Sequence, residues 1–217
     1  MRAPLSRGTL ALVTPPAQEP VTLAELKGHA RIDVADEDAL LTSLITTARG
    51  YVEESTGRAL LTQTWSLTLD DWPRSAPLHD WWDGVRDGAL TSVLAAERVP
   101  IPKAPFLAVS TVELLDEDGT PTAVPAGVWY SAPKSGQGEL VRRRGQVWPV
   151  PLRDAGGIRI RFTAGYGTLP AQVPFAIRQA ILLLGAHWYE TREPALDRGT
   201  SVPFTIAALL APYRVMR

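Results

Sequence analysis

The sequence predicts an α+β protein in which helices at both ends of the chain flank a run of strands. Apolar residues recur at helical spacing from about residue 22 to residue 57, and again from 176 to 193. Between these segments the spacing changes to two, and turns rich in glycine and proline separate short alternating stretches. At 217 residues, the chain is expected to form one domain with appendages.

Composition narrows the classes of function. The formal net charge of −1 gives no general attraction to nucleic acid or anionic membranes. The chain has no cysteine, which excludes disulfides and thiolate metal sites. The apolar part of "MRAPLSRGTLALVTPPAQ" is too short for a signal peptide, and the longest apolar run, 180–186, is far shorter than a membrane span. We therefore expect a soluble protein that is cytoplasmic where it is made and has no membrane partner.

Two helices are predicted near the N-terminus. Thr22 is expected to cap the first helix, and Glu25, three residues later, completes a capping box. The second helix is expected to hold the acidic residues 36–38 in its first turn, where the helix dipole favours carboxylates. Gly57 is its expected left-handed terminator. Its predicted apolar face consists of Leu40, Leu41, Leu44, Ile45, Ala48, Tyr51 and Val52.

The strands begin after this helix. In "LTQTWSLTLDDWP", Trp65, Leu67 and Leu69 share one side, as in a half-buried strand. Further strands are predicted at "VSTVELLD" (109–116), "GVWYSA", "GELVRRR" and "GGIRIRFTAGYG". The stretch 74–97 is interpreted as an insertion that carries a short helix near 89–96.

The helix that follows the strands has almost no polar face. Pro174 is expected in its first turn, where a missing N–H costs nothing. One side carries Ile177, Ile181, Leu184 and Trp188. Another side carries Leu182, Leu183, Ala186 and Tyr189. Because helices that are apolar nearly all round are buried on more than one side, something must cover the second side as well.

No motif predicts catalysis, a metal or a cofactor. His29, His79 and His187 lack the paired spacing of a zinc site, and His187 is expected to be structural. The densest acidic group is interspersed with tryptophans and consists of Asp70, Asp71, Asp80, Asp83 and Asp87 with Trp72, Trp81 and Trp82. Such a group suits a divalent cation or a sugar, so a carbohydrate or nucleotide enzyme stays open as an alternative. Its spacing matches no known ligand loop, which favours a polar loop anchored by aromatic residues.

A second polar candidate is the run Arg142, Arg143 and Arg144. Arginines in such a run can contact phosphates or an acidic partner surface. Three charges beside a turn are more often a solvated strand end, so this run is a secondary candidate for partner contact.

Four segments, taken in order, resemble the head–tail connector (adaptor) proteins of long-tailed phages and gene transfer agents. They are "TPPAQEPVTLAELKGHARID" with "DEDALLTSLITTARGYVEESTGRALLTQTW", then "IPKAPFLAVSTVELLDEDG", then "IRIRFTAGYGTLPAQVPFAIRQAILLLGAHWYETRE", and the closing "LLAPYR". They span nearly the whole chain except about 74–97. Each motif alone is short, whereas the ordered set is specific.

The resemblance implies a fold and a role. The fold would be a single, mainly helical connector domain over 1–217. Its helical core would be 20–57 and 173–191, its inserted antiparallel β-region 61–168, and its extended C-terminal tail 192–217. The role would be structural and non-enzymatic, without a cofactor: a ring of usually twelve copies under the portal, joined to a stopper or tail-completion protein. DNA would pass through the channel without being read, and the protein, made in the host cytoplasm, would be assembled at the head–tail junction.

The resemblance also suggests where partners bind. In a ring, the second apolar side of the last helix, Leu182, Leu183, Ala186 and Tyr189, would meet a neighbouring subunit through a heterologous contact. The tail is too apolar to stay solvated and is expected to insert into the portal or an adjacent subunit, with docking on its own subunit as the alternative. Its predicted contact residues are Phe204, Ile206, Leu209, Leu210, Tyr213, Arg214 and Arg217. A monomeric protein-binding module remains the other reading of these apolar surfaces.

Overall fold

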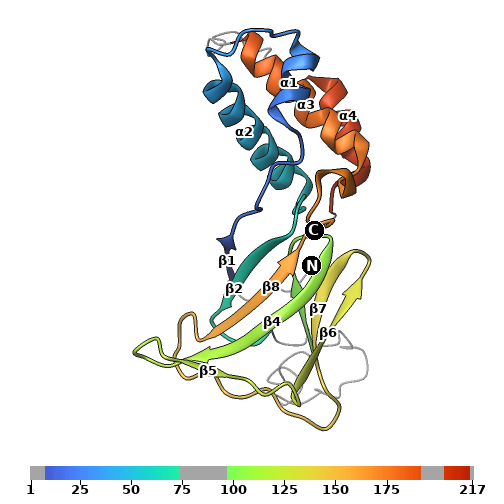
Figure 1. The fold of residues 1–217 in the computed structure, drawn as a ribbon. Helices are drawn as coiled ribbons and strands as arrows, with labels where there is room; N and C mark the ends of the chain where they lie inside the picture. The colour runs from blue at the N-terminus through green and yellow to red at the C-terminus, as the bar shows by residue number, and fades with distance from the viewer. Residues whose placement is uncertain (1–7, 74–96, 192–202, 216–217) are drawn as a thin grey trace. The chain divides into compact units, whose positions relative to one another are not determined.

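The structure is a computed structural model, and it describes residues 8–73, 97–191 and 203–215 (Figure 1). The chain divides into two compact units. The β unit is formed by Met1–Thr14, Thr64–Pro102 and Phe106–Thr163, and the helical unit by Pro15–Gln63, Lys103–Pro105 and Ala164–Arg217. The predicted α+β class is confirmed. The expectation of a mainly helical chain is too strong, because α-helices and strands take similar shares of the described residues.

The first helix of the helical unit, α1 (Leu23–Ala30), has the predicted capping box. The Thr22 hydroxyl accepts the Glu25 N–H at 3.2 Å, and the Glu25 carboxylate accepts the Thr22 N–H at 2.7 Å. Arg31 ends the helix in the left-handed conformation, with φ of 56°. This entry to the helical unit is therefore specified locally, because both free N–H groups find their acceptors within three residues.

The second helix, α2, runs from Asp38 to Thr56 and ends at Gly57, which is left-handed as predicted. Its start differs from the prediction: residues 36–37 lie before the first turn, because the Asp38 N–H is bonded to the Ala35 carbonyl in a preceding turn. Its buried stripe is Leu41, Ile45, Ala48 and Val52. Leu40 and Tyr51, predicted on the buried face, are 41% and 39% exposed.

The long apolar helix, α3 (Phe175–Glu190), lies among the other three helices and contacts α1, α2 and α4 (Phe204–Leu210). Pro174 is the residue before its first turn rather than within it. Short 3₁₀ turns flank α3 and α4: η1 at Pro170–Gln172 and η2 at Ala211–Tyr213. The shared core contains Leu26, Leu41, Ile45, Ala48, Val52, Leu60, Ile177, Ile181, Leu184, Ile206 and Leu210 among others.

The β unit has a five-stranded sheet in the order β1-β2-β8-β4-β5 and a three-stranded sheet in the order β3-β7-β6. The strands predicted from alternation are present as β2 (Gln63–Leu69), β4 (Phe106–Leu115), β6 (Trp129–Lys134), β7 (Gln137–Arg142) and β8 (Ile158–Ala164). Three further strands were not predicted: β1 (Gly8–Thr14), β3 (Arg98–Ile101) and β5 (Pro121–Ala123). The strand pairs β1–β2, β3–β7, β4–β5 and β6–β7 are antiparallel.

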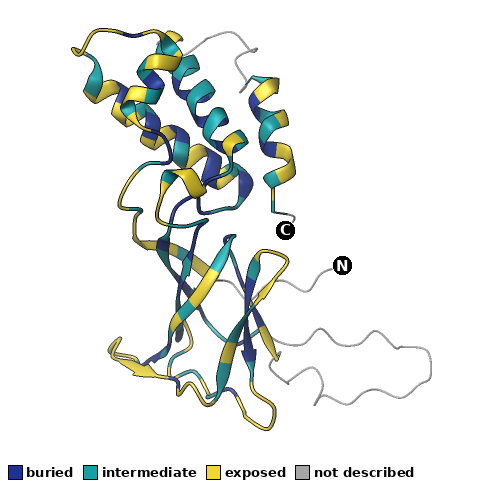
Figure 2. Cartoon of the chain, turned by 45° about the vertical axis from the view of Figure 1, so that its right-hand side comes forward, coloured by how far each residue is buried: buried dark blue, intermediate teal, exposed yellow. Residues whose placement is uncertain are grey.

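The burial of these strands explains which of them the sequence indicated. Along β8, residues at every second position are buried, from Ile158 to Ala164, which produces the alternation that predicts a strand. Along β1 nearly every residue is exposed (Figure 2), so its composition follows no alternation even though it pairs with β2. Edge strands of this kind carry a weak sequence signal.

Candidate partner-binding surfaces

The predicted subunit interface lies on α3. Its buried stripe, which includes Ile177 and Leu184, points into the core of the helical unit. The predicted interface residues Leu182, Leu183, Ala186 and Tyr189 are all half-buried and pack at the margin of that core. Residues of the same chain therefore cover part of the second apolar side. What remains accessible is a partial apolar face, and its use between subunits stays a prediction.

Tyr189 also has a contact within the chain. Its hydroxyl donates to the carboxylate of Glu37, the residue that precedes α2. This bond ties the end of α3 to the beginning of α2. Sequence patterning assigned Tyr189 only an apolar role, because the partner is distant along the chain.

The C-terminal tail folds back onto its own helical unit. Ile206 and Leu210, four residues apart on α4, are buried in the core beside α3. A partner can reach these two residues only if α4 leaves α3, and their contact with a partner stays a prediction.

The rest of the tail stays accessible. Phe204 is 85% exposed, Leu209 and Tyr213 are half-buried, and Arg214 is exposed. Arg217 lies outside the described residues. With α4 docked on α3, the tail presents a smaller candidate surface for a partner than the sequence predicted, and Phe204 is its most exposed apolar residue.

Arg58, just after α2, holds the end of the tail. Its Nε donates to the Tyr213 carbonyl at 2.5 Å, and its guanidinium lies 5.8 Å and 6.0 Å from the ring centroids of Tyr166 and Tyr213. Cation–π contacts of this geometry are favourable. The Val215 N–H donates to the Thr56 carbonyl at 2.9 Å, which fixes the tail to the end of α2.

The arginine run is largely occupied within the chain. Arg142 lies 3.6 Å from a Glu97 carboxylate oxygen. The Arg143 side chain donates to the carbonyls of Ala126 and Trp129 at 3.3 Å and 3.2 Å. Arg144 is exposed. Partner contact by this run stays a prediction, and these bonds leave Arg144 as its most accessible member.

The acidic and aromatic group has structural contacts where it is described. The carboxylate of Asp70 accepts the Gly156 N–H at 2.7 Å, and that of Asp71 accepts the Trp72 N–H at 2.8 Å. The Trp72 ring is buried and stacks on Trp148 with centroids 4.1 Å apart. The remaining members, Asp80, Asp83, Asp87, Trp81 and Trp82, lie outside the described residues, as do His79 and the helix predicted near 89–96.

Two other kinds of site are absent from the described residues. Among them, no group of three or more histidine or acidic residues is placed to hold a metal ion. Of the helices described, none is long and apolar enough to cross a membrane.

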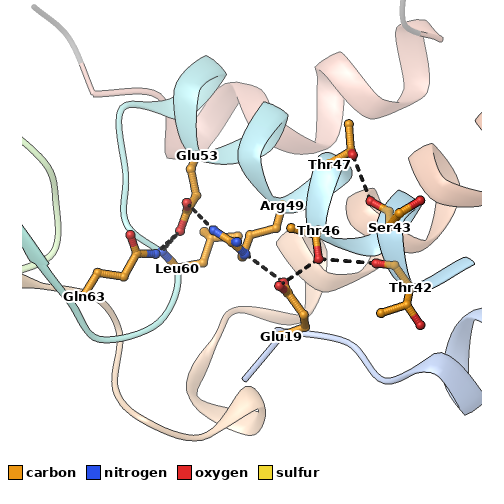
Figure 3. Close-up of polar contacts among 9 residues, drawn as sticks. All are labelled: Glu19, Thr42, Ser43, Thr46, Thr47, Arg49, Glu53, Leu60 and Gln63. Atoms are coloured by element: carbon orange, nitrogen blue, oxygen red, sulfur yellow. Dashed lines mark hydrogen bonds and ion pairs between the residues drawn. The ribbon is translucent and has the colours of Figure 1, made fainter. Parts of the chain in front are cut away.

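A buried carboxylate network at the end of α2 was not predicted (Figure 3). Glu53 accepts the Leu60 N–H at 2.9 Å and the Gln63 side-chain amide through Oε1, and Arg49 Nη1 through Oε2 at 3.0 Å. Arg49 Nε also pairs with Glu19 at 2.7 Å. Burial lowers the pKa of Arg49, but the hydrogen bonds and charges of Glu19 and Glu53 outweigh it and raise this pKa above its ordinary value.

This network connects three segments of the helical unit: the residues before α1, the middle of α2 and the loop after Gly57. Each oxygen of the Glu53 carboxylate has a hydrogen-bond donor, so the buried charge is compensated and serves the fold. The sequence signal that could have found it is the spacing of Arg49 and Glu53, which are four residues apart on the helix.

The N-terminal part of the chain is similar to a known protein family. The family model described as phage gp6-like head–tail connector protein matches residues 20–78, which include α1, α2 and β2. No curated protein matches the sequence significantly.

Solved structures match nearly the whole chain. A chain from the neck of an empty gene transfer agent particle, computed with C6 symmetry, is 26% identical with a TM-score of 0.74. A chain from the virion of a native gene transfer agent particle is 28% identical with a TM-score of 0.73. A chain from the neck of a native particle, computed with C12 symmetry, is 26% identical with a TM-score of 0.69. In each case the match covers 96% of both chains.

The family segment and the fold agree on the class of protein: a head–tail connector of phage-like particles. The predicted resemblance is thereby confirmed. The α+β arrangement of helices and antiparallel strands is the fold of the matched neck chains.

Proposed function

We propose that this chain is a non-enzymatic adaptor at the head–tail junction. It forms a ring of twelve copies under the portal at the capsid vertex, and it links the portal to stopper or tail-completion proteins around a DNA channel. The observation that carries this proposal is the match, over 96% of both chains, to neck chains of gene transfer agent particles, one of them computed with C12 symmetry.

The ring contact is assigned to the accessible side of α3. Leu182, Leu183, Ala186 and Tyr189 are half-buried in one subunit and would be buried further by a neighbour. Phe175, 76% exposed in the first turn of the same helix, extends this apolar surface. Burying a few hundred Å² more apolar surface, at ~25 cal/mol/Å², favours the contact by several kcal/mol before the cost of association.

The portal contact is assigned to the accessible part of the tail. Phe204, Leu209 and Tyr213 supply apolar surface, and Arg214, with Arg217 beyond the described residues, would pair with carboxylates of the portal. The Arg142–Arg144 run is the secondary candidate for this contact. DNA in the channel is expected to pass without being read, and the net charge of −1 fits this, because strong phosphate contacts would retain the duplex.

A deletion and complementation experiment in the host that makes the particle tests the proposal. Removing the gene should yield filled heads without tails, and a plasmid copy of the wild-type chain should restore tailed particles. Labelling the complementing chain and imaging the particles should place it at the neck. Tailed, active particles in the deletion strain would refute the adaptor function.

A further inference from the structure

The outward side of α2 is unusual for a solvent-exposed helix surface. We call the exposed residues Leu40, Ser43, Thr47, Gly50 and Tyr51, on the side away from the buried stripe of α2, the α2 outer face. Over these residues the face carries no charge, and the exposed Glu54, one turn after Gly50, borders it at the end of the helix. Arg49, the one charged residue between Asp38 and Glu53, forms salt bridges with Glu19 and Glu53. Depletion of charge is a mark of the core of protein–protein interfaces.

The hydroxyl groups of Ser43 and Thr47 on this face are already satisfied within the helix, and the Thr47 bond is drawn in Figure 3. Ser43 Oγ donates to the Leu40 carbonyl at 2.7 Å, and Thr47 Oγ1 donates to the Ser43 carbonyl at 2.8 Å. Beside them, Thr46 Oγ1 donates to Glu19 at 3.1 Å. Because the Ser43 and Thr47 donors keep their acceptors when water is removed, covering the face leaves only the Tyr51 hydroxyl to be satisfied by the partner.

Gly50 supplies a second, independent observation. It lies inside α2, where glycine is the least favourable residue after proline. A Cβ added there would meet no atom within 4 Å, so packing within the chain does not require a glycine. A glycine on an exposed helix surface allows a partner to come close to the backbone. The position is therefore suited to an intermolecular contact rather than to the fold of one subunit.

We infer that the α2 outer face packs against the outer side of α3 in a second copy of this chain. The outer side of α3, opposite its buried stripe, carries Phe175, Gln179, Leu182, Leu183 and Ala186, and its first charged residue is the exposed Glu190 at the end of the helix. Large apolar side chains on one helix can pack over the small residues Ser43, Thr47 and Gly50 on the other, and these central stretches bring no charges together. This inference rests on the proposed ring and names the second half of its heterologous contact.

The size of the α2 outer face sets the strength of the contact. From Leu40 to Tyr51 it extends for about 18 Å at 1.5 Å per residue. A strip of this length and only one helix side wide has a much smaller area than the ~800 Å² per partner that a stable pair buries. A single contact is therefore weak, and closure of the ring, in which every copy has two neighbours, is what sustains it.

The natural absence of cysteine allows a direct crosslinking test. The variant with both Thr47→Cys and Leu183→Cys, oxidised at millimolar concentration, should give a ladder of covalent oligomers that extends beyond the dimer. Each single variant should give no ladder, and an equimolar mixture of the two single variants should stop at the heterodimer. A double variant that gives no species above the dimer overturns the inference.

A matched pair of glycine variants tests the face without relying on crosslinking geometry. In the double-cysteine background, Gly50→Gln should abolish the ladder while the melting temperature stays at or above the parent value, because glutamine favours helix. Gly28→Gln is the control, since Gly28 is also an exposed helical glycine with open space around it but lies on α1. It should leave the ladder intact. A ladder that survives Gly50→Gln overturns the inference.

The crosslinking and complementation experiments can fail independently of each other. A chain that forms the ladder but is not needed for tailed particles would support the contact and refute the adaptor function. A chain that is needed for tails but forms no ladder would refute the contact and leave the adaptor function standing.

Discussion

Replacing the buried carboxylate at the end of α2 should destabilise the helical unit strongly. Glu53→Ala removes the acceptor of the buried Leu60 N–H and of the Gln63 amide, and it takes from Arg49 one of its two carboxylates. Each buried donor left unsatisfied costs about 1–3 kcal/mol. Arg49 keeps Glu19, which limits the charge penalty. We therefore expect the free energy of unfolding to fall by about 3–5 kcal/mol, the usual cost of breaking a buried ion pair.

Urea unfolding followed by far-UV circular dichroism measures this loss, because that signal is dominated by the helices. Glu54→Ala is the matched control: its side chain is 77% exposed, and its carboxylate lies 3.8 Å from Lys103 Nζ. Lys103 is itself buried, but a pair this long with a solvated carboxylate contributes about 1 kcal/mol or less. If Glu53→Ala destabilises the protein no more than Glu54→Ala does, the network does not support the fold as argued.

Four further predictions concern the cap and the partner surfaces. Thr22→Ala should cost about 1 kcal/mol of stability. The Thr22 backbone N–H lowers the pKa of Glu25, so stability from the ionised carboxylate is full above about pH 4.5 and is lost as the pH falls through the lowered pKa. Unfolding curves of wild type and Glu25→Gln should therefore converge in acid, and a constant difference would contradict this. Leu183→Asp should block ring assembly, measured by light scattering. It should still melt well above Leu184→Asp, in which the new carboxylate replaces a fully buried side chain. Equal melting temperatures of the two variants would contradict the placement of Leu183 on the accessible side of α3. Phe204→Asp should keep the wild-type melting temperature but reduce co-sedimentation with portal-bearing heads, and unreduced binding would move the portal contact elsewhere.

Features that depend on neighbours along the chain could be predicted from the sequence. The capping box of α1 is complete within Thr22 and Glu25, and the end of α2 needs only the left-handed Gly57. The buried stripes of α2 and α3 follow from helical spacing. In each case the residues that form the pattern in the sequence lie within a few helical turns of the contacts that they make.

Features that depend on distant partners could not be predicted. Strand β1 pairs with β2 across the whole of α1 and α2, and its exposed residues carry no alternation. Glu53 resembles a surface partner of Arg49 in sequence, and only the loop that brings Leu60 over it makes it buried. The tail had to pack somewhere, but composition alone does not choose between its own α3 and another protein.

The bond between Val215 and Thr56 has a consequence for solution measurements. Chain ends usually fray, and their amides exchange with solvent almost freely. Here the Val215 amide is closed by a carbonyl at the far end of α2, so its exchange rate depends on how firmly the whole tail is held. A partner that captures the tail would speed this exchange while the amides between Ile177 and Leu184 stay protected. One amide near the C-terminus can thus report which protein holds the tail at a given moment.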